Sequence, residues 1–190
     1  MNKVYGIADL HFGHEKIARI RGFGSIEYHD NALIENWNRK VNKNDTVWIL
    51  GDVAMGHYGY IDLLGRLKGY KKLVLGNHDT SPTEYYLRHV ERVYGAVRLK
   101  DYILTHIPVH PSQFPRFKGN IHGHLHDQKL EDNRYFCVSA EHTEYAPMLL
   151  SDIIAKLSNK NVCDQKVNGS CPHNNLICTW PYCEQVYPHD

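Results

Sequence analysis

The sequence of 190 residues lacks a long apolar run and lacks a strong excess of charge of either sign. No stretch approaches the roughly 20 consecutive apolar residues of a membrane-spanning helix. The start, MNKVYGIADL, has no signal-peptide core, because Asp9 interrupts a short apolar run. The formal net charge is +1, so the composition demands neither a nucleic-acid nor a membrane partner. We therefore expect a protein of the cytoplasm.

Cysteine is scarce over most of the chain. Cys137 stands alone before residue 163, and the other four fall between there and the end. We expect one globular domain over residues 1–158, which is long enough for a full core, and a distinct tail with Cys and His over 159–190. The tail has no C-x-x-C pair, so a small zinc site and a loop-rich strap packed on the domain both stay open. Disulfides are not expected in a reducing cytoplasm.

Strand-like and helical patterns alternate in the first half of the chain, and strands dominate the second half. Strands are predicted at 3–8, 45–50, 71–75, 96–100, 102–106, 120–124 and 134–140. Helices are predicted at 14–21, 28–42, 58–68, 82–92 and 151–158. The alternation implies a parallel sheet with helices outside, and hence an α/β domain. Trp37 and Trp48 lie at apolar-periodic or strand positions and are expected in the core.

Polar side chains follow three successive predicted strands, at the point where each strand ends. They are Asp9 and His11, then Asp52, then Asn77, His78 and Asp79. Each cluster alone also suits a helix cap or a turn. Three clusters after three parallel strands favour a site, because ligands bind at the carboxyl edge of such sheets.

Later strands add imidazoles to this set. His106 ends YILTH, and GNIHGHLHD at 119–127 adds His122, His124 and His126. Carboxylates, an amide and several imidazoles form a mixed oxygen–nitrogen donor set, which suits Mn, Fe, Zn, Ni or Co better than Ca or Mg. The donors exceed the needs of one ion and suit two ions that share a carboxylate. Such pairs serve phosphatases, nucleases and aminopeptidases.

The ordered motifs resemble those of the calcineurin-like metallophosphoesterases, in particular the small single-domain bacterial and phage phosphoesterases. They are DLH at 9–11, GD at 51–52, GNHD at 76–79, TH at 105–106 and GHLH at 123–126. The resemblance spans residues 1 to about 150. It implies a four-layered α-β-β-α sandwich, which agrees with the two-part strand pattern.

The resemblance also implies how the ligands are shared between two divalent transition-metal ions, with manganese among the candidates. The first ion would take Asp9, His11, Asp52 and His126. The second would take Asp52, Asn77, His106 and His124. Asp52 would bridge, because a carboxylate has two oxygens. His122 matches no ligand of the family and is expected to pack inside the domain.

The mechanism implied by the resemblance is hydrolysis of a phosphomonoester or phosphodiester by a metal-bridging hydroxide. His78 would stabilise developing charge and protonate the leaving oxygen, and Asp79 would orient His78. Substrate contacts are predicted for His14, His110 and Arg116. A helix residue that supports the ligands stays open for His14, and a solvated loop stays open for His110 and Arg116. For Arg21, a substrate contact and a solvated helix face both stay open.

Three functions are compatible with these motifs. The leading one is a phosphoesterase acting on a small nucleotide-like substrate, and the second is a nuclease with the same chemistry. The third is a non-catalytic metal-binding module, which the intact GNHD disfavours. A nuclease wants a basic groove, which a nearly neutral chain does not clearly offer. A small phosphoester is therefore the expected partner, nucleic acid stays an alternative, no membrane contact is expected, and the oligomeric state stays open.

Overall fold

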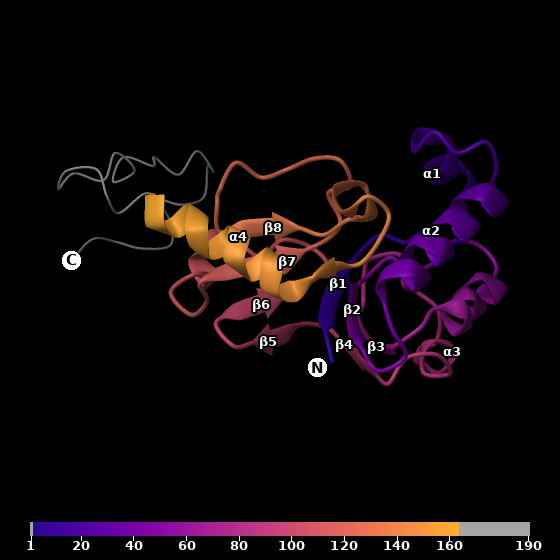
Figure 1. The fold of residues 1–190 in the computed structure, drawn as a ribbon, viewed down its shortest axis with the longest axis horizontal. Helices are drawn as coiled ribbons and strands as arrows, with labels where there is room; N and C mark the ends of the chain where they lie inside the picture. The colour runs from indigo at the N-terminus through magenta and orange to yellow at the C-terminus, as the bar shows by residue number, and fades with distance from the viewer. Residues whose placement is uncertain (1, 164–190) are drawn as a thin grey trace.

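Two β-sheets form the centre of the structure (Figure 1), a computed structural model that describes residues 2–163. The five-stranded sheet has the order β4-β3-β2-β1-β9 and the four-stranded sheet the order β5-β6-β7-β8. The first comprises β1 (Val4–Ile7), β2 (Thr46–Leu50), β3 (Tyr70–Val74), β4 (Arg92–Tyr94) and β9 (Met148–Leu149). The second comprises β5 (Val97–Leu99), β6 (Tyr102–Leu104), β7 (Gly119–His122) and β8 (Tyr135–Cys137).

Most neighbouring strands run parallel, as the strand–helix alternation predicts. Strands β1 to β4 are parallel to one another, and so are β6, β7 and β8. The edge strands β9 and β5 pair antiparallel with β1 and β6. Beyond the strands, Ala8 and Ser139 form a bridge between the two sheets. The carboxyl ends of β1 and β8 therefore meet.

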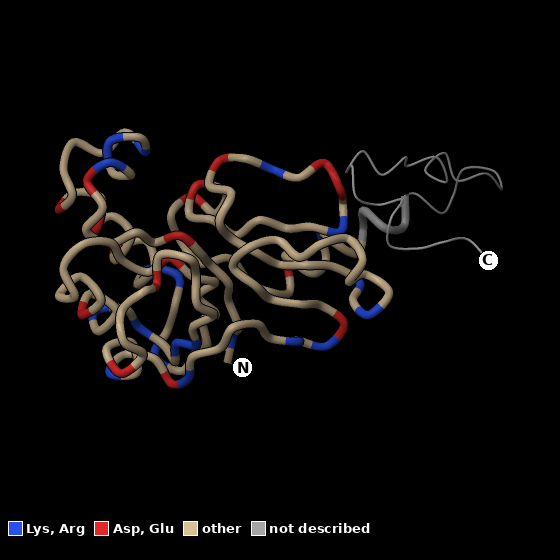
Figure 2. The backbone as a smooth tube through the Cα atoms, turned by 180° about the vertical axis from the view of Figure 1, so that it is seen from behind, with Lys and Arg blue, Asp and Glu red and all other residues tan. Residues whose placement is uncertain are grey.

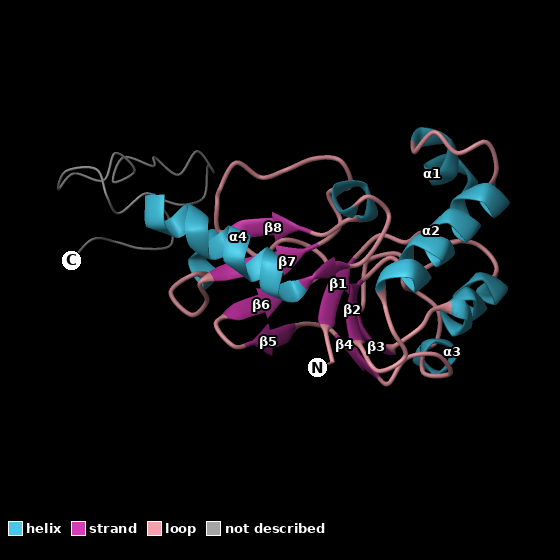
Figure 3. Cartoon of the chain, viewed as in Figure 1, coloured by secondary structure: helices cyan, strands magenta, loops and turns pink. Residues whose placement is uncertain are grey.

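The helical elements are of unequal length and type. They are α1 (Glu15–Ile20), α2 (Ile26–Lys40), η1 (Tyr58–Arg66), α3 (Thr83–Tyr86), η2 (Pro111–Gln113), η3 (Ala140–Thr143) and α4 (Leu150–Cys163), where η marks a 3₁₀ helix. Figure 3 shows α1, α2 and α3 on the outer side of the five-stranded sheet and α4 beside the four-stranded sheet. None of the helices in the described part of the chain has the length and apolar character of a membrane span.

Two apolar clusters fill the space between these layers. One cluster joins α2, η1 and α3 to one face of the five-stranded sheet, with Ile7, Ile49 and Leu73 among its members. The other lies between the sheets, with Leu50, Leu104 and Ile121, and α4 adds Ile153 and Leu157. Successive residues of β2 thus face opposite sides of the sheet, as expected for a strand buried on both faces.

The segment 107–118, which includes η2, covers the outward face of the four-stranded sheet. Tyr135 Oη donates to Val109 O at 2.6 Å, and Val109 N donates to Asn120 Oδ1 at 3.0 Å. The α/β layered sandwich predicted from the sequence is therefore confirmed, with this segment as the outer cover of the second sheet.

Some predicted boundaries were wrong. The predicted helix 82–92 stops at Tyr86, because Arg92 already pairs with Lys72 and draws the chain into β4. The predicted helix 58–68 is a 3₁₀ helix, in which Gly59 and Gly65 have low α-helical propensity. The alternatives for the tail fall on residues outside the described range, apart from 159–163, which continue α4.

Trp37 is predicted to dominate the packing of α2. Its side chain is 1% exposed, and Nε1 donates to Lys68 O at 2.9 Å. Replacing Trp37 by Ala should lower the free energy of unfolding by about 3–5 kcal/mol, because a cavity remains. Tyr28→Ala on the same helix is the control, since Tyr28 is 76% exposed. Urea unfolding measures both, and equal losses would contradict the assignment of Trp37 to the core.

Candidate metal centre

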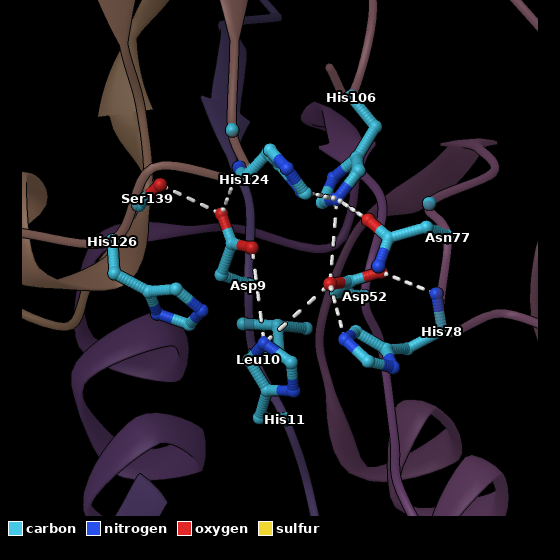
Figure 4. Close-up of polar contacts among 12 residues, drawn as sticks. Asp9, Leu10, His11, Asp52, Asn77, His78, His106, His124, His126 and Ser139 are labelled. Carbon is cyan, nitrogen blue, oxygen red and sulfur yellow. Dashed lines mark hydrogen bonds and ion pairs between the residues drawn. The ribbon is translucent and has the colours of Figure 1, made fainter. Parts of the chain in front are cut away.

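The candidate ligands gather where the carboxyl ends of five strands meet (Figure 4). Asp9, Asp52 and Asn77 follow β1, β2 and β3, and His106 and His124 follow β6 and β7. Both sheets thus contribute donors to one place. This is the edge at which α/β sheets bind ligands.

The first group consists of Asp9, His11 and His126, whose nearest donor atoms all lie within 4.8 Å of one another. Asp9 Oδ2 accepts from Ser139 Oγ at 2.7 Å and from His124 N at 2.9 Å. Within the described part of the chain, Asp9 Oδ1 and both ring nitrogens of His11 are buried and have no hydrogen-bond partner. Buried polar atoms normally have a partner. The donor chemistry and these unpaired atoms therefore fit a divalent cation.

The second group consists of Asp52, His106 and His124 and meets the same 4.8 Å criterion. Nδ1 of His106 lies 2.7 Å from Leu50 O and donates to it, which leaves Nε2 as an acceptor. Nε2 then faces Asn77 Oδ1 at 2.9 Å, Asp52 Oδ2 at 3.3 Å and His124 Nδ1 at 3.2 Å. Lone pairs that converge in this way also fit a divalent cation.

Asp52 lies between the two groups. Its Oδ2 is 3.3 Å from His106 Nε2 and 3.6 Å from His11 Nε2, while Oδ1 accepts from His78 N at 3.0 Å. One carboxylate oxygen therefore faces imidazoles of both groups. This is the position that a ligand shared by two ions needs.

Burial and neighbouring charges hold His11 and Asp52 in the forms that bind a metal, whereas the pKa values of Asp9, His106 and His126 are shifted upward. Burial lowers the pKa of His11 to about 3, although the charge of Asp52 opposes the shift, so the imidazole is neutral at pH 7. Burial alone would raise the pKa of Asp52, but the hydrogen bond and charge of His106 outweigh it and lower this pKa. Burial raises the pKa of Asp9. A cation beside Asp9 would stabilise its ionised form.

Five candidate ligands have left-handed backbone conformations. Their φ angles are 58° for Asp9, 50° for His11, 55° for Asp52, 71° for His124 and 52° for His126. Positive φ is uncommon outside glycine, although Asp and His adopt it more readily than most residues. Such conformations are typical of functional sites. All five residues lie in the loops that follow β1, β2 and β7.

His78 lies at the open side of the centre. Its side chain is 45% exposed, and Nε2 is 4.0 Å from Asp52 Oδ2. Its ring packs edge-on against His11, with 5.7 Å between centroids. The imidazole therefore reaches both solvent and the candidate ligands.

The structure corrects the orienting role predicted for Asp79. The Asp79 carboxylate accepts the backbone N–H groups of Asp52, Val53 and Gly76 at 2.8, 2.9 and 2.8 Å. Among the described residues it makes no side-chain hydrogen bond to His78. Asp79 instead joins the loop after β3 to the loop after β2, and so fixes where Asp52 lies.

Of the predicted substrate contacts, only His14 lies beside the centre. Its ring is 5.6 Å from that of His11 between centroids, and its Nδ1 accepts from Ile17 N at 3.4 Å at the start of α1. His110 Nδ1 accepts from Ser112 N at the start of η2. Arg116 lines a hollow with Phe114 and other residues. Within the described chain, neither His110 nor Arg116 bonds to a candidate ligand.

His122 is packed inside the domain, as expected. Its Nδ1 lies 2.8 Å from Gly123 O, and its ring meets Tyr135 edge-on at 5.9 Å. Burial lowers the pKa of His122 to about 4. Of the three neighbouring histidines, His124 and His126 are therefore candidate ligands, and His122 is a core residue.

Sequence reasoning missed three residues around the first group. Ser139 bonds to Asp9, Glu141 Oε1 lies 2.9 Å from His126 Nδ1, and Arg21 pairs with Glu141 at 2.8 Å. The Arg21 side chain is 1% exposed, so the predictions of a solvated face and of a substrate contact were both wrong. No motif marks these residues, because they approach the ligands only in the folded chain.

The fold and the site define an α/β protein with two layered sheets and a centre of Asp and His side chains at the strand ends. No family model matches the chain. The solved structure of AQ665 from Aquifex aeolicus, a protein of unknown function, aligns with 82% of this chain and 99% of that chain. Its TM-score is 0.64 at 24% identity, so the two share a fold. A novel archaeal phosphodiesterase covers 72% of this chain and 82% of its own at 19% identity, with a TM-score of 0.42, a similarity that does not bear on function.

A relative that covers most of the chain shows the family. The chain is 32% identical over 181 residues to the uncharacterized protein MJ1445 of Methanocaldococcus jannaschii, covering 88% of this chain and 98% of that protein. The chain belongs to the same family as MJ1445. It is also 43% identical over 84 residues to the Gene 66 protein of Mycobacterium phage L5, which is 42% of this chain. The match spans 41% of the length of that phage relative.

Proposed function

We propose that the chain is a metal-dependent phosphoesterase of the calcineurin-like type, which hydrolyses phosphomonoesters or phosphodiesters. The observation that carries the proposal is the position of Asp52 Oδ2, 3.3 Å from one imidazole of the second group and 3.6 Å from one of the first. A carboxylate placed between two sets of Asp, Asn and His donors suits the paired metal ions that serve in phosphoester hydrolysis.

The residues of the two groups would hold two divalent transition-metal ions, of Mn, Fe, Ni, Co or Zn. These are Asp9, His11 and His126 on one side, Asn77, His106 and His124 on the other, and Asp52 between them. Bound there, the ions would supply Lewis acidity that activates water and neutralises charge on phosphoryl oxygens.

His78 and His14 are the imidazoles placed to act on a phosphoester. His78 is exposed and 4.0 Å from Asp52, so it can donate a proton to a leaving oxygen above the centre. Burial lowers the pKa of His14, whose ring lies against His11. Because Nδ1 accepts from Ile17 N, the neutral ring carries its proton on Nε2, and His14 can donate a hydrogen bond to a phosphoryl oxygen.

The charge distribution favours a small substrate over a nucleic acid. Lys and Arg are interspersed with Asp and Glu over the described chain (Figure 2). A nuclease is typically marked by a row of basic residues that follows the phosphate backbone. A nuclease with the same chemistry remains the second candidate.

Metal content and hydrolysis test the proposal together. The purified protein, loaded with Mn²⁺ and freed of excess metal, should contain about two ions per chain and hydrolyse bis-p-nitrophenyl phosphate or p-nitrophenyl phosphate. A chelator should abolish the hydrolysis, and added Mn²⁺ should restore it. Full activity with one ion per chain would contradict the shared centre. Cleavage of a short DNA but of neither ester would favour the nuclease.

A further inference from the structure

A buried arginine connects the end of α1 to the first group of candidate ligands. Arg21 Nη2 donates to Asp9 O at 2.7 Å, and Nη1 donates to Leu10 O at 3.3 Å. The guanidinium thus holds the main chain at the two residues that precede His11. Because its planar donors are fixed relative to one another, it fixes direction as well as distance.

Glu141, in η3, joins this arginine to His126. A single oxygen, Glu141 Oε1, accepts from Arg21 Nε at 2.9 Å and lies 2.8 Å from Nη2. The same oxygen is 2.9 Å from His126 Nδ1. The Arg21 guanidinium is always charged, and its ion pair favours the ionised carboxylate of Glu141.

The ionised carboxylate determines which nitrogen of His126 carries the proton. An ionised carboxylate only accepts hydrogen bonds, so Nδ1 of His126 must be the donor. Nε2 of the neutral ring then keeps its lone pair. His126 also stacks on His11, with 5.0 Å between ring centroids, so the ring cannot turn freely.

The network extends from Arg21 to the loop after His11. Arg21 Nη1 lies 2.9 Å from His29 Nε2, and His29 Nδ1 lies 2.8 Å from Asp30 Oδ1. Asp30 Oδ2 accepts from Gly13 N at 3.0 Å. Hydrogen bonds therefore fix the chain on both sides of His11 as well as the ring of His126.

We propose that Arg21 and Glu141 are positioning residues of the first metal group, which fix the tautomer and direction of His126 and the backbone at Asp9. The proposal rests on the metal centre of the proposed function. Partners that orient metal-binding histidines typically contribute 10–100-fold to metal affinity. The second group has no contact with either residue among the described side chains, so its affinity should not depend on them.

Calorimetric titration with Mn²⁺ tests this without any phosphoester. The wild type should bind two ions. The double variant Arg21→Met/Glu141→Leu removes both buried charges together, and it should weaken one of the two sites by about 10–100-fold while the other keeps its affinity. The single variant Glu141→Gln retains the oxygen that accepts from His126, so it should keep most of the affinity that the double variant loses. Arg19→Met/Glu15→Gln, an exposed pair on the same helix, is the matched control.

Each outcome decides one point. A wild type that binds no metal refutes the centre and the proposed function. A double variant that melts at a lower temperature but binds two ions with unchanged affinities refutes the positioning role alone, as does equal weakening of both sites. Imidazole ¹H–¹⁵N spectra of the wild type, assigned with His126→Gln, give a second test that requires no destabilising change. The proposal expects the proton of His126 on Nδ1, and a proton on Nε2 instead would overturn it.

Discussion

Asp52→Asn should remove both metal ions and reduce phosphoester hydrolysis by more than about 10²-fold. Oδ2 of Asp52 faces His11 at 3.6 Å and His106 at 3.3 Å, so the change weakens both groups at once. The amide of Asn carries no charge, so its oxygen would hold two neighbouring cations much more weakly than the carboxylate oxygen does. Even partners beyond the ligands contribute 10–100-fold to metal affinity, and a shared ligand should contribute more. Elemental analysis and hydrolysis of bis-p-nitrophenyl phosphate measure the two effects.

Two further Asp→Asn variants show whether the loss of both ions is specific to Asp52. Asp9→Asn should empty the first group while the second still binds, because Asp9 belongs to the first group only. Asp45→Asn tests for a general effect of the substitution. The Asp45 carboxylate accepts from Lys3 N and Asn42 N, at the other end of the strands, and its loss should leave metal content unchanged. If Asp52→Asn loses only one ion, Asp52 is not shared.

His78→Ala should slow the hydrolysis of esters with poor leaving groups by about 10²–10⁴-fold, the usual contribution of a general acid. Both ions should stay bound. The backbone N–H of residue 78, which donates to Asp52 Oδ1, remains in the variant. A p-nitrophenyl ester should suffer less, because p-nitrophenolate leaves without a proton. Single-turnover rates on alkyl and p-nitrophenyl esters measure the difference.

Three results for His78 have different meanings. An equal loss on good and poor leaving groups would assign His78 to charge stabilisation on the phosphoryl oxygens instead of proton donation. Unchanged rates on both would remove it from the mechanism. His89→Ala is the matched control. His89 lies away from the centre, and its Nε2 is 2.8 Å from Asp62 Oδ1. Its rates should equal those of the wild type.

The parts of the fold that have strong local patterns were predictable from the sequence. β1 and β2 are mostly apolar and buried, and β3 ends in the buried pair Leu73 and Val74. The carboxyl ends of these strands place the candidate ligands Asp9, Asp52 and Asn77. β4 was missed because a helix was predicted as far as residue 92, and β9 was missed because it has two residues, which become a strand by pairing with β1. Runs this short have no measurable alternation.

The candidate site divides in the same way. Donor residues could be read from chain positions, since a parallel sheet brings successive strand ends together. The partners that hold the donors could not. Glu141 is 120 residues from Arg21, and only the tertiary fold buries the arginine that the end of α1 would otherwise expose. Asp79 belongs to a motif, but its actual backbone partners depend on how two loops meet.

The left-handed conformations at Asp9, His11, Asp52, His124 and His126 limit how relatives of this chain can diverge. Each costs a non-glycine residue roughly 1–2 kcal/mol, and glycine adopts the same angles without this cost. A lineage released from selection for metal binding should therefore accumulate glycine or asparagine at these five positions, gaining stability as it loses donors. β-Branched residues should stay absent there in active and inactive descendants alike. The residue types at these five positions should therefore indicate which members of the family still bind metal.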